Sequence, residues 1–305
     1  MAHTPGSTFR ARWLVAALAA LTSAVALAAE PNSAEPPAQR TGAVLKEIAG
    51  LTMPESAVAH PDGRIFVTEI GEFNKAGDGK VTVVHPDGRT ETLVGGLNDP
   101  KGMALSGEHL YVADMDRVLL IGLDGAVTEL AKPGDFPHKP VFLNDVEIGG
   151  DGVVYVSDSG DDKGQGAGIY AIAPDGGIRT VLGANAGIVR PNGLLIDGAG
   201  ALLVADFGTG KLYRLVMKKA GGRPALKLLY SGFGAADGLV RDRDGALYVS
   251  DWKGGKVWRL STPRSAPQLI AEGHKSSADI ALSADGGYLL MPDMMAGKLV
   301  FLPLK

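Results

Sequence analysis

Short apolar runs that each end on an acidic residue recur along this chain. They are rich in Val, Leu, Ile and Tyr, as strands are, and turns rich in Gly, Pro and Asp separate them. Successive runs end 42 to 48 residues apart, at Glu69, Asp114, Asp158, Asp206, Asp251 and Asp293. A period in the forties with several short strands per repeat is typical of propeller blades. The pattern therefore predicts an all-β fold, a six-bladed β-propeller with four-stranded blades.

The first and last repeats indicate how the ring closes. Four strands are expected in the first repeat, at 56–59, 64–69, 80–85 and 90–94. The last repeat offers only three, at 280–282, 288–291 and 298–303. We therefore predict that the run 43–48, which precedes the first blade, supplies the missing strand of the last one. Such a pairing would leave no open edge between the first and last blades.

The N-terminal segment has the composition of an export signal. Two arginines precede an Ala- and Leu-rich run that ends in small residues near position 28. We predict a cleaved signal peptide at 1–29, a flexible Pro-containing leader at 30–42 and the propeller domain at 43–305. An uncleaved membrane anchor is the alternative. Cleavage would give a periplasmic or secreted protein with no stable membrane association.

Composition and charge exclude several classes of function. The 305 residues include 30 Lys and Arg against 34 Asp and Glu, with no basic block, which argues against nucleic-acid binding. The chain has no cysteine, so disulfides, thiolate nucleophiles and cysteine-based metal sites are excluded. It also lacks the Gly-x-Ser-x-Gly turn of many serine hydrolases.

The residues that open the six expected inner strands are mostly polar. Aligning the repeats places one residue of each at the same position: Glu55, Lys101, Asn144, Asn192, Asp237 and Ala278. Because inner strands surround the axis of a propeller, these side chains are expected to converge at one end of the central channel. Two carboxylates and two amides there match the oxygen ligands of calcium. We predict that Ca²⁺, or another divalent cation such as Mg²⁺, Mn²⁺ or Zn²⁺, is bound by Glu55, Asn144, Asn192 and Asp237.

Neighbouring polar residues are candidates for catalysis and substrate binding. Asp237 is the first candidate for a general base and His138 the second. Asn144, Asp145 and Lys101 are candidate substrate-binding residues. Simpler interpretations exist for each: an exposed loop histidine, an aspartate that caps a turn, a lysine paired with a nearby aspartate, and ring residues that satisfy turn amides.

The order of these strand openings resembles one known family. The resemblance is carried by four motifs, Glu55, Asn144-Asp145, Asn192-Gly193 and Asp237-Gly238. They are similar to those of the senescence-marker-protein/gluconolactonase (regucalcin-like) family of six-bladed propeller lactonases, over about residues 43–305. The resemblance implies a metal held by Glu55, Asn192 and Asp237, and Asp237 as the base. A Pro-Glu-Ser sequence stands where the family often has Glu-Gly-Pro, and no residue matches its substrate-contacting arginine.

These features together predict an exported, divalent-metal-dependent hydrolase of lactones or related esters. The metal would polarise the carbonyl group while Asp237 assists the attack of water. The expected partner is a small-molecule lactone or ester, and no nucleic acid. The alternative, from another class, is a non-catalytic periplasmic propeller that binds a ligand or a protein and holds a structural cation, because this fold hosts many functions.

Overall fold

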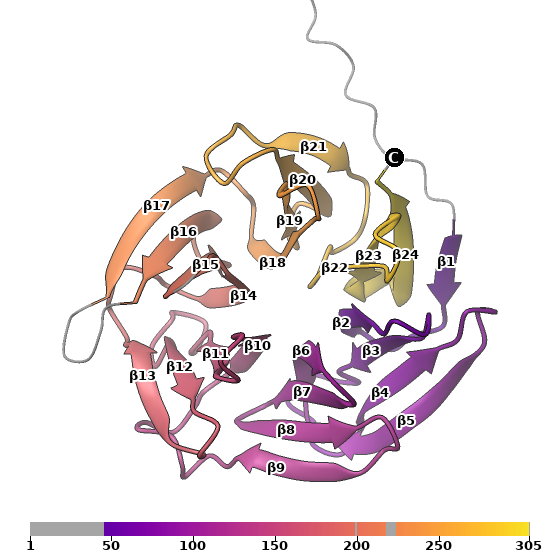
Figure 1. The fold of residues 1–305 in the computed structure, drawn as a ribbon, viewed down its shortest axis with the longest axis horizontal. Coiled ribbons are helices and arrows are strands. Elements are labelled where there is room, and N and C mark those ends of the chain that lie inside the picture. The colour runs from indigo at the N-terminus through magenta and orange to yellow at the C-terminus, as the bar shows by residue number, and fades with distance from the viewer. Residues whose placement is uncertain (1–45, 199, 218–223, 305) are drawn as a thin grey trace, which may run out of the picture. The chain divides into compact units, whose positions relative to one another are not determined.

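Six four-stranded antiparallel sheets surround a common centre in the computed structural model (Figure 1). The structure describes residues 46–198, 200–217 and 224–304, all of which belong to one compact unit, Gln39–Lys305. The predicted six-bladed β-propeller with four-stranded blades is confirmed. Within the described residues, no helix has the length and apolarity needed to span a membrane. The predicted signal peptide and leader lie outside the described residues.

In blades 1 to 3 the strands follow sequence order across each sheet. Blade 1 consists of β2 (Pro54–Ala59), β3 (Ile65–Glu69), β4 (Gly79–Val84) and β5 (Thr90–Leu97). Blade 2 consists of β6 (Pro100–Ser106), β7 (His109–Asp114), β8 (Arg117–Gly122) and β9 (Val127–Ala131). Blade 3 consists of β10 (Leu143–Ile148), β11 (Val154–Asp158), β12 (Gly168–Ile172) and β13 (Ile178–Leu182).

Blades 4 and 5 repeat this order, and blade 6 takes its outer strand from the other end of the chain. Blade 4 consists of β14 (Pro191–Ile196), β15 (Ala201–Asp206), β16 (Lys211–Val216) and β17 (Ala225–Ser231). Blade 5 consists of β18 (Ala236–Arg241), β19 (Leu247–Asp251), β20 (Lys256–Leu260) and β21 (Gln268–Ala271). Blade 6 consists of β22 (Ala281–Leu282), β23 (Tyr288–Asp293), β24 (Lys298–Pro303) and β1 (Lys46–Ala49), with a 3-10 turn at Met294–Ala296.

The ring is closed by the strand that precedes blade 1, as predicted. Strand β1 pairs antiparallel with β24, with Lys46 opposite Phe301 (Figure 1). Ile48 and the following Leu51 are each 9% exposed and pack in one cluster with Ile65 of blade 1. The chain ends thus contribute both hydrogen bonds and apolar contacts to the junction of blades 6 and 1. The described strand begins at Lys46, and the earlier part of the predicted strand, 43–45, lies outside the described residues.

The repeated acid at the end of each second strand has a structural role. Asp158 is fully buried, and its carboxylate accepts hydrogen bonds from the backbone N–H groups of Val141 (2.9 Å) and Phe142 (2.8 Å). These two residues lead directly into the inner strand β10. The same carboxylate also accepts from Gly160 N at 2.9 Å. Buried N–H groups need such partners. Each acid therefore ties the loop that precedes the inner strand of its blade to the end of the second strand.

We expect Asp251→Ala to lower the free energy of unfolding by about 3–5 kcal/mol, because three backbone donors lose their acceptor. The Asp251 carboxylate accepts from Gly234 N and Ala235 N at 2.8 Å, and from Gly254 N at 2.9 Å. Chemical denaturation measures the change. Asp244→Ala, at an exposed turn in the same blade, is the matched control and should change stability by less than about 0.5 kcal/mol. Equal effects of the two substitutions would contradict this role.

Candidate functional site

The inner strands of blades 1 to 5 each begin with a β-bulge. The pairing register shifts between Pro191 and Leu194 in β14, and between Ala236 and Leu239 in β18. Equivalent shifts occur in β2, β6 and β10. The two residues inside each bulge are the predicted ring residue and the residue that follows it. Because a bulge bends the strand and redirects side chains, it can turn the ring residue out of the regular in-and-out alternation.

Five of the six predicted ring residues line a single cavity of about 270 Å³. They are Glu55, Lys101, Asn144, Asn192 and Asp237. Each is at most 6% exposed, although all are charged or carry an amide. The sixth position, Ala278, is fully buried and carries no polar side chain. The structure therefore brings together the four residues predicted to bind a cation.

Each of the four carries a buried oxygen without a hydrogen-bond partner. These atoms are Glu55 Oε2, Asn144 Oδ1, Asn192 Oδ1 and Asp237 Oδ1. The orientation of one amide is fixed by its neighbours: Asn144 Nδ2 donates to Ser159 Oγ at 3.1 Å, and Ser159 Oγ donates to the Pro191 carbonyl at 2.7 Å. Unsatisfied buried oxygens cost free energy. Four in one cavity indicate a site built to receive a cationic or hydrogen-donating ligand.

The chemistry of these four oxygens fits a hard divalent cation. Carboxylate and amide oxygens are ligands that calcium prefers, and water supplies the rest of its coordination shell. Within the described part of the chain, no group of three or more His, Cys, Asp or Glu side chains is arranged to hold a metal. The ring has only two carboxylates, so its capacity for a cation depends on the two amides as well.

The two ring carboxylates lie in an environment that opposes their ionisation. Burial raises the pKa of Glu55 well above its usual value, and the nearby carboxylates of Asp237 and Asp279 raise it further. Burial likewise raises the pKa of Asp237, with Asp279 adding to the effect. A bound cation would favour the ionised forms. Cation affinity should therefore fall as the pH is lowered and these groups take up protons.

We expect the metal-free protein to lose stability as the pH rises from about 5 to about 8. Burial raises the pKa of Asp279 to about 7, and it raises the pKa of Glu55 and Asp237 as well. In the unfolded chain these carboxyls titrate near pH ~4. Between the two values the folded state holds protons that the unfolded state has lost, so raising the pH favours unfolding. Thermal unfolding in a chelator should give a Tm roughly 5–10 °C lower at about pH 8 than at about pH 5.5.

Calcium provides the control for this pH dependence. If the ring is a calcium site, calcium favours its deprotonated form, so it should raise the Tm more at the higher pH and remove most of the difference. A metal-free protein that is more stable at the higher pH would contradict the assignment of raised pKa values to this cluster.

Two glycines that follow ring residues are required by the close approach of neighbouring inner strands. A Cβ atom on Gly193 would lie 2.1 Å from the carbonyl oxygen of Asp237. A Cβ atom on Gly238 would lie 2.4 Å from Asp279 Oδ1. Neither distance is compatible with a side chain. The glycines thus let β14, β18 and the start of blade 6 come close enough for their ring residues to share one cavity.

Asp145 does not lie in the ring cavity. It lines a different cavity, of about 340 Å³, together with Glu147 and Asp279. Both of its carboxylate oxygens are engaged, Oδ2 with Leu194 N at 2.6 Å and Oδ1 with Val146 N at 2.7 Å. Its contacts join the inner strands of blades 3 and 4. The structure therefore gives no support to the predicted contact between Asp145 and substrate.

Lys101 lies in the ring cavity, as expected for a substrate-binding candidate, but it is also paired. Its Nζ donates to the Asp99 carbonyl at 3.1 Å, lies 3.7 Å from Asp99 Oδ2 and sits 4.1 Å from the centre of the Phe142 ring. Burial lowers the pKa of Lys101, whereas Asp99 and Glu55 oppose that change. The simpler interpretation, a lysine paired with a nearby aspartate, is therefore part of the structure.

His138 does not reach the ring cavity. It is exposed on the loop between β9 and β10, and it is not among the residues that line the cavity. Its proposed role as a second general base finds no geometric support. Of the two predicted catalytic residues, only Asp237 lies beside the other ring residues.

The walls of the cavity were not identified from the sequence. They consist of Ile70, Phe73, Phe142, Ser159, Arg190, Phe207, Trp252 and Met294. Five of these directly follow a strand-ending acid: Ile70, Ser159, Phe207, Trp252 and Met294. Phe142 and Arg190 each stand two residues before a ring residue. Both positions recur in every repeat, so the same alignment that gave the ring could have given most of the wall.

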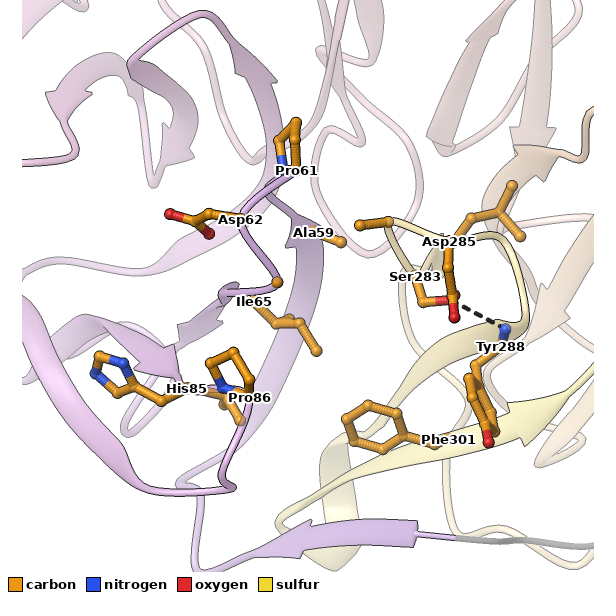
Figure 2. A pocket seen from close by; sticks show the side chains of 14 residues that line it. Ala59, Pro61, Asp62, Ile65, His85, Pro86, Ser283, Asp285, Tyr288 and Phe301 are labelled. Carbon is orange, nitrogen blue, oxygen red and sulfur yellow. Dashed lines mark hydrogen bonds between the residues drawn. The ribbon is translucent and has the colours of Figure 1, made fainter.

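A larger cavity lies elsewhere, between blades 1 and 6 (Figure 2). It has a volume of about 980 Å³ and is lined by turn residues such as Asp62 and by apolar residues such as Phe301. Figure 2 shows the side chains of Asp62 and His85 pointing away from Tyr288 and Phe301. Asp62 bonds instead to Arg64, and His85 to Glu91, each at 2.8 Å. No buried polar groups converge there, so the ring cavity is the better candidate despite its smaller size.

Comparison with known proteins agrees with the propeller geometry. The family model described as "SMP-30/Gluconolactonase/LRE-like region" matches residues 103–287, more than half of the chain. This range contains three of the four predicted cation ligands, Asn144, Asn192 and Asp237. No curated protein sequence matches the chain significantly.

Several solved structures share the fold at low sequence identity. A protein provisionally assigned as a gluconolactonase is 21% identical, with a TM-score of 0.71, over 88% of this chain and 93% of that one. Regucalcin from Agrobacterium tumefaciens, described as a calcium-binding protein, is 19% identical, with a TM-score of 0.69, over 86% and 93%. A gluconolactonase from Xanthomonas campestris is 16% identical, with a TM-score of 0.70, over 84% and 88%. These likenesses establish the fold.

Proposed function

Because the chain belongs to the SMP-30/gluconolactonase/LRE-like family, we propose that it is an exported, divalent-metal-dependent hydrolase of lactones or related esters. The observation that carries the proposal is the set of four buried, unpartnered oxygens in one cavity. A structural role in the propeller would not need polar groups left unsatisfied. Calcium is the first candidate cation, since the ligand atoms are all oxygens and a similar propeller is described as calcium-binding.

The residues that would hold the cation are Glu55, Asn144, Asn192 and Asp237. When bound, a divalent cation supplies Lewis acidity that polarises an ester carbonyl. The amides of Asn144 and Asn192 add ligand oxygens without adding negative charge. The two carboxylates would balance the charge of a divalent cation, which leaves the positive charge of Lys101 in the cavity.

Asp237 is the proposed general base. It is 2% exposed and lines the ring cavity, so its carboxylate is placed to accept a proton from a water molecule bound there. Lys101 contributes a positive charge to the same cavity and is held by Asp99. We propose that Lys101 stabilises negative charge that develops on the substrate oxygen during the attack of water.

Export is a part of the proposal that rests on the sequence alone. The predicted signal peptide at 1–29 and leader at 30–42 precede the propeller, and they lie outside the described residues. Cleavage after the signal would place the propeller in the periplasm or outside the cell. N-terminal sequencing of the protein from a native-like host, separated into periplasmic and membrane fractions, tests this part.

The hydrolase proposal is tested with metal-stripped protein and a panel of lactones and esters. The panel contains sugar, aliphatic and aromatic lactones, each measured at neutral pH with and without added calcium. Turnover that appears only with a divalent cation supports the proposal. Calcium binding without turnover of any substrate would overturn it in favour of a non-catalytic propeller with a structural cation. That alternative has no separate support from the geometry.

A further inference from the structure

The cavity above the ring is mostly apolar. Besides the ring residues, two polar side chains line it, Ser159 and Arg190. The other six lining side chains are apolar: Ile70, Phe73, Phe142, Phe207, Trp252 and Met294. The hydroxyl of Ser159 is already engaged with Asn144 and the Pro191 carbonyl. Recognition of a polyhydroxylated substrate needs many free hydrogen-bonding groups, because each buried hydroxyl must be paired. The wall instead suits a substrate with an apolar or aromatic body.

Arg190 is the exception in this apolar wall, and its backbone is firmly held. Its N–H donates to Asp206 Oδ1 at 2.9 Å, and its carbonyl accepts from Phe207 N at 2.9 Å. The guanidinium carbon lies 5.3 Å from the centre of the Phe207 ring. Phe207 in turn contacts Trp252, with ring centres 5.9 Å apart. The arginine is therefore the first member of a row that crosses from blade 4 to blade 5.

The charge of Arg190 is not balanced by a carboxylate in the described part of the chain. Its Nε is buried without a hydrogen bond, and among the described residues no carboxylate forms an ion pair with the guanidinium. The charge of Arg190 contributes only slightly to the lowered pKa of Asp161. Hydrogen bonds from Gln165 N and Lys163 N are the main cause of that lowering. A guanidinium with a buried donor left free is costly unless a ligand supplies the acceptor.

The position of Arg190 shows where that acceptor would lie. A second cavity, of about 280 Å³, is lined by Lys253 and Asp162. It shares three lining residues with the ring cavity: Arg190, Phe207 and Trp252. The three side chains thus form the boundary between the two cavities. A substrate whose ester group reaches the ring would place its far end at this boundary.

We propose that Arg190 is a specificity-determining residue that binds a carboxylate on the substrate, while the apolar or aromatic body of the substrate lies against Phe207 and Trp252. A guanidinium matches a carboxylate through two parallel hydrogen bonds. The inference rests on the proposed hydrolase function and names its substrate class: carboxylate-bearing apolar lactones or esters, in preference to neutral sugar lactones.

The proposed role of Arg190 can be tested without turnover, by comparing the binding of one charged and one neutral substrate analogue. Phenylacetate and its neutral isostere phenylacetamide are titrated by calorimetry into the calcium-loaded protein. We expect phenylacetate to bind about tenfold to a hundredfold more tightly, and Arg190→Gln to remove this preference. Arg190→Lys should keep only part of it, because the planar pair of donors is lost. Arg179→Gln, at an exposed arginine on β13, is the matched control and should change nothing.

Several outcomes would overturn the proposal. One is equal binding of the two analogues to the wild-type protein. Another is a preference that persists in Arg190→Gln, which would assign the carboxylate to the cation or to Lys101. A third is tighter binding of phenylphosphonate than of phenylacetate, which would indicate that Arg190 recognises a phosphate-like group and not a carboxylate.

Turnover separates failure of this inference from failure of the proposed function. The matched substrates are 4-acetoxybenzoate and phenyl acetate, each measured with calcium. We expect Arg190→Gln to lower kcat/KM about tenfold or more for the charged ester and to leave the neutral ester within about twofold. If neither ester nor any lactone is hydrolysed, the hydrolase proposal fails, and the calorimetry alone decides the role of Arg190.

Discussion

Asp237→Asn is expected to abolish calcium binding at micromolar concentrations and to reduce kcat/KM for lactone hydrolysis by about a thousandfold or more. The substitution changes few atoms but removes one of only two carboxylates in the ring. It also removes the proposed base. Asp237 Oδ1 is buried and unpartnered, and the carboxylate's side-chain hydrogen-bond partner is Asn192, another ring residue. Calorimetry with calcium and steady-state kinetics measure the two losses separately.

Asp145→Asn is the matched control for this prediction. Asp145 is also a buried aspartate beside a ring residue, but its oxygens already accept from Leu194 N and Val146 N. Calcium affinity should therefore stay within a few-fold of the wild type, whatever the change in stability. Retention of calcium binding by Asp237→Asn, or its equal loss in both variants, would contradict the assignment of the site to unpartnered oxygens.

Removal of residues 1–50 is expected to unfold the propeller. Strand β1 is the outer strand of blade 6, and all four of its residues pair with β24. Ile48, buried at the junction with blade 1, is lost with it. The loss of these hydrogen bonds and apolar contacts should cost more than about 5 kcal/mol, which is comparable to the whole stability of many domains. Circular dichroism and denaturation with guanidinium report the outcome.

Two further variants isolate the contribution of the strand. Removal of residues 1–40 keeps β1 and should leave the denaturation midpoint unchanged. Ile48→Ala should cost about 2–4 kcal/mol, because it leaves a cavity between blades 6 and 1. A cooperatively folded protein without residues 1–50, with the midpoint of the longer chain, would show that the ring does not need this closure.

The fold was predictable because it is a repeated local pattern. Each repeat combines alternating apolar residues with tight turns, and the strand-ending acids set the period. The observed hydrogen bonds explain why those acids recur: Asp158 and Asp251, for example, hold the loops that enter β10 and β18. Because each blade makes this contact once, each repeat of the sequence has one such acid. Even the closing strand was predictable, because the last repeat lacked one.

The ring was predictable from the same alignment, but the directions of its neighbours were not. A regular strand would turn Asn144 and Asp145 to opposite faces. In the observed bulge, Asn144 lines the ring cavity, whereas Asp145 lines a different cavity and accepts a hydrogen bond from Leu194 N of β14. The sequence does not show where the register shifts, so Asp145 was assigned to the substrate. Side chains on irregular loops, such as His138, follow no period, and their directions become known only from the structure.

A crystal structure of the protein grown with calcium, or with manganese to provide an anomalous signal, tests the proposed cation site most directly. We expect one cation in the ring cavity, at about 2.3–2.6 Å from oxygens of Glu55, Asn144, Asn192 and Asp237 if it is calcium. Water bridging these four oxygens at saturating calcium, with no cation in the ring, would contradict it.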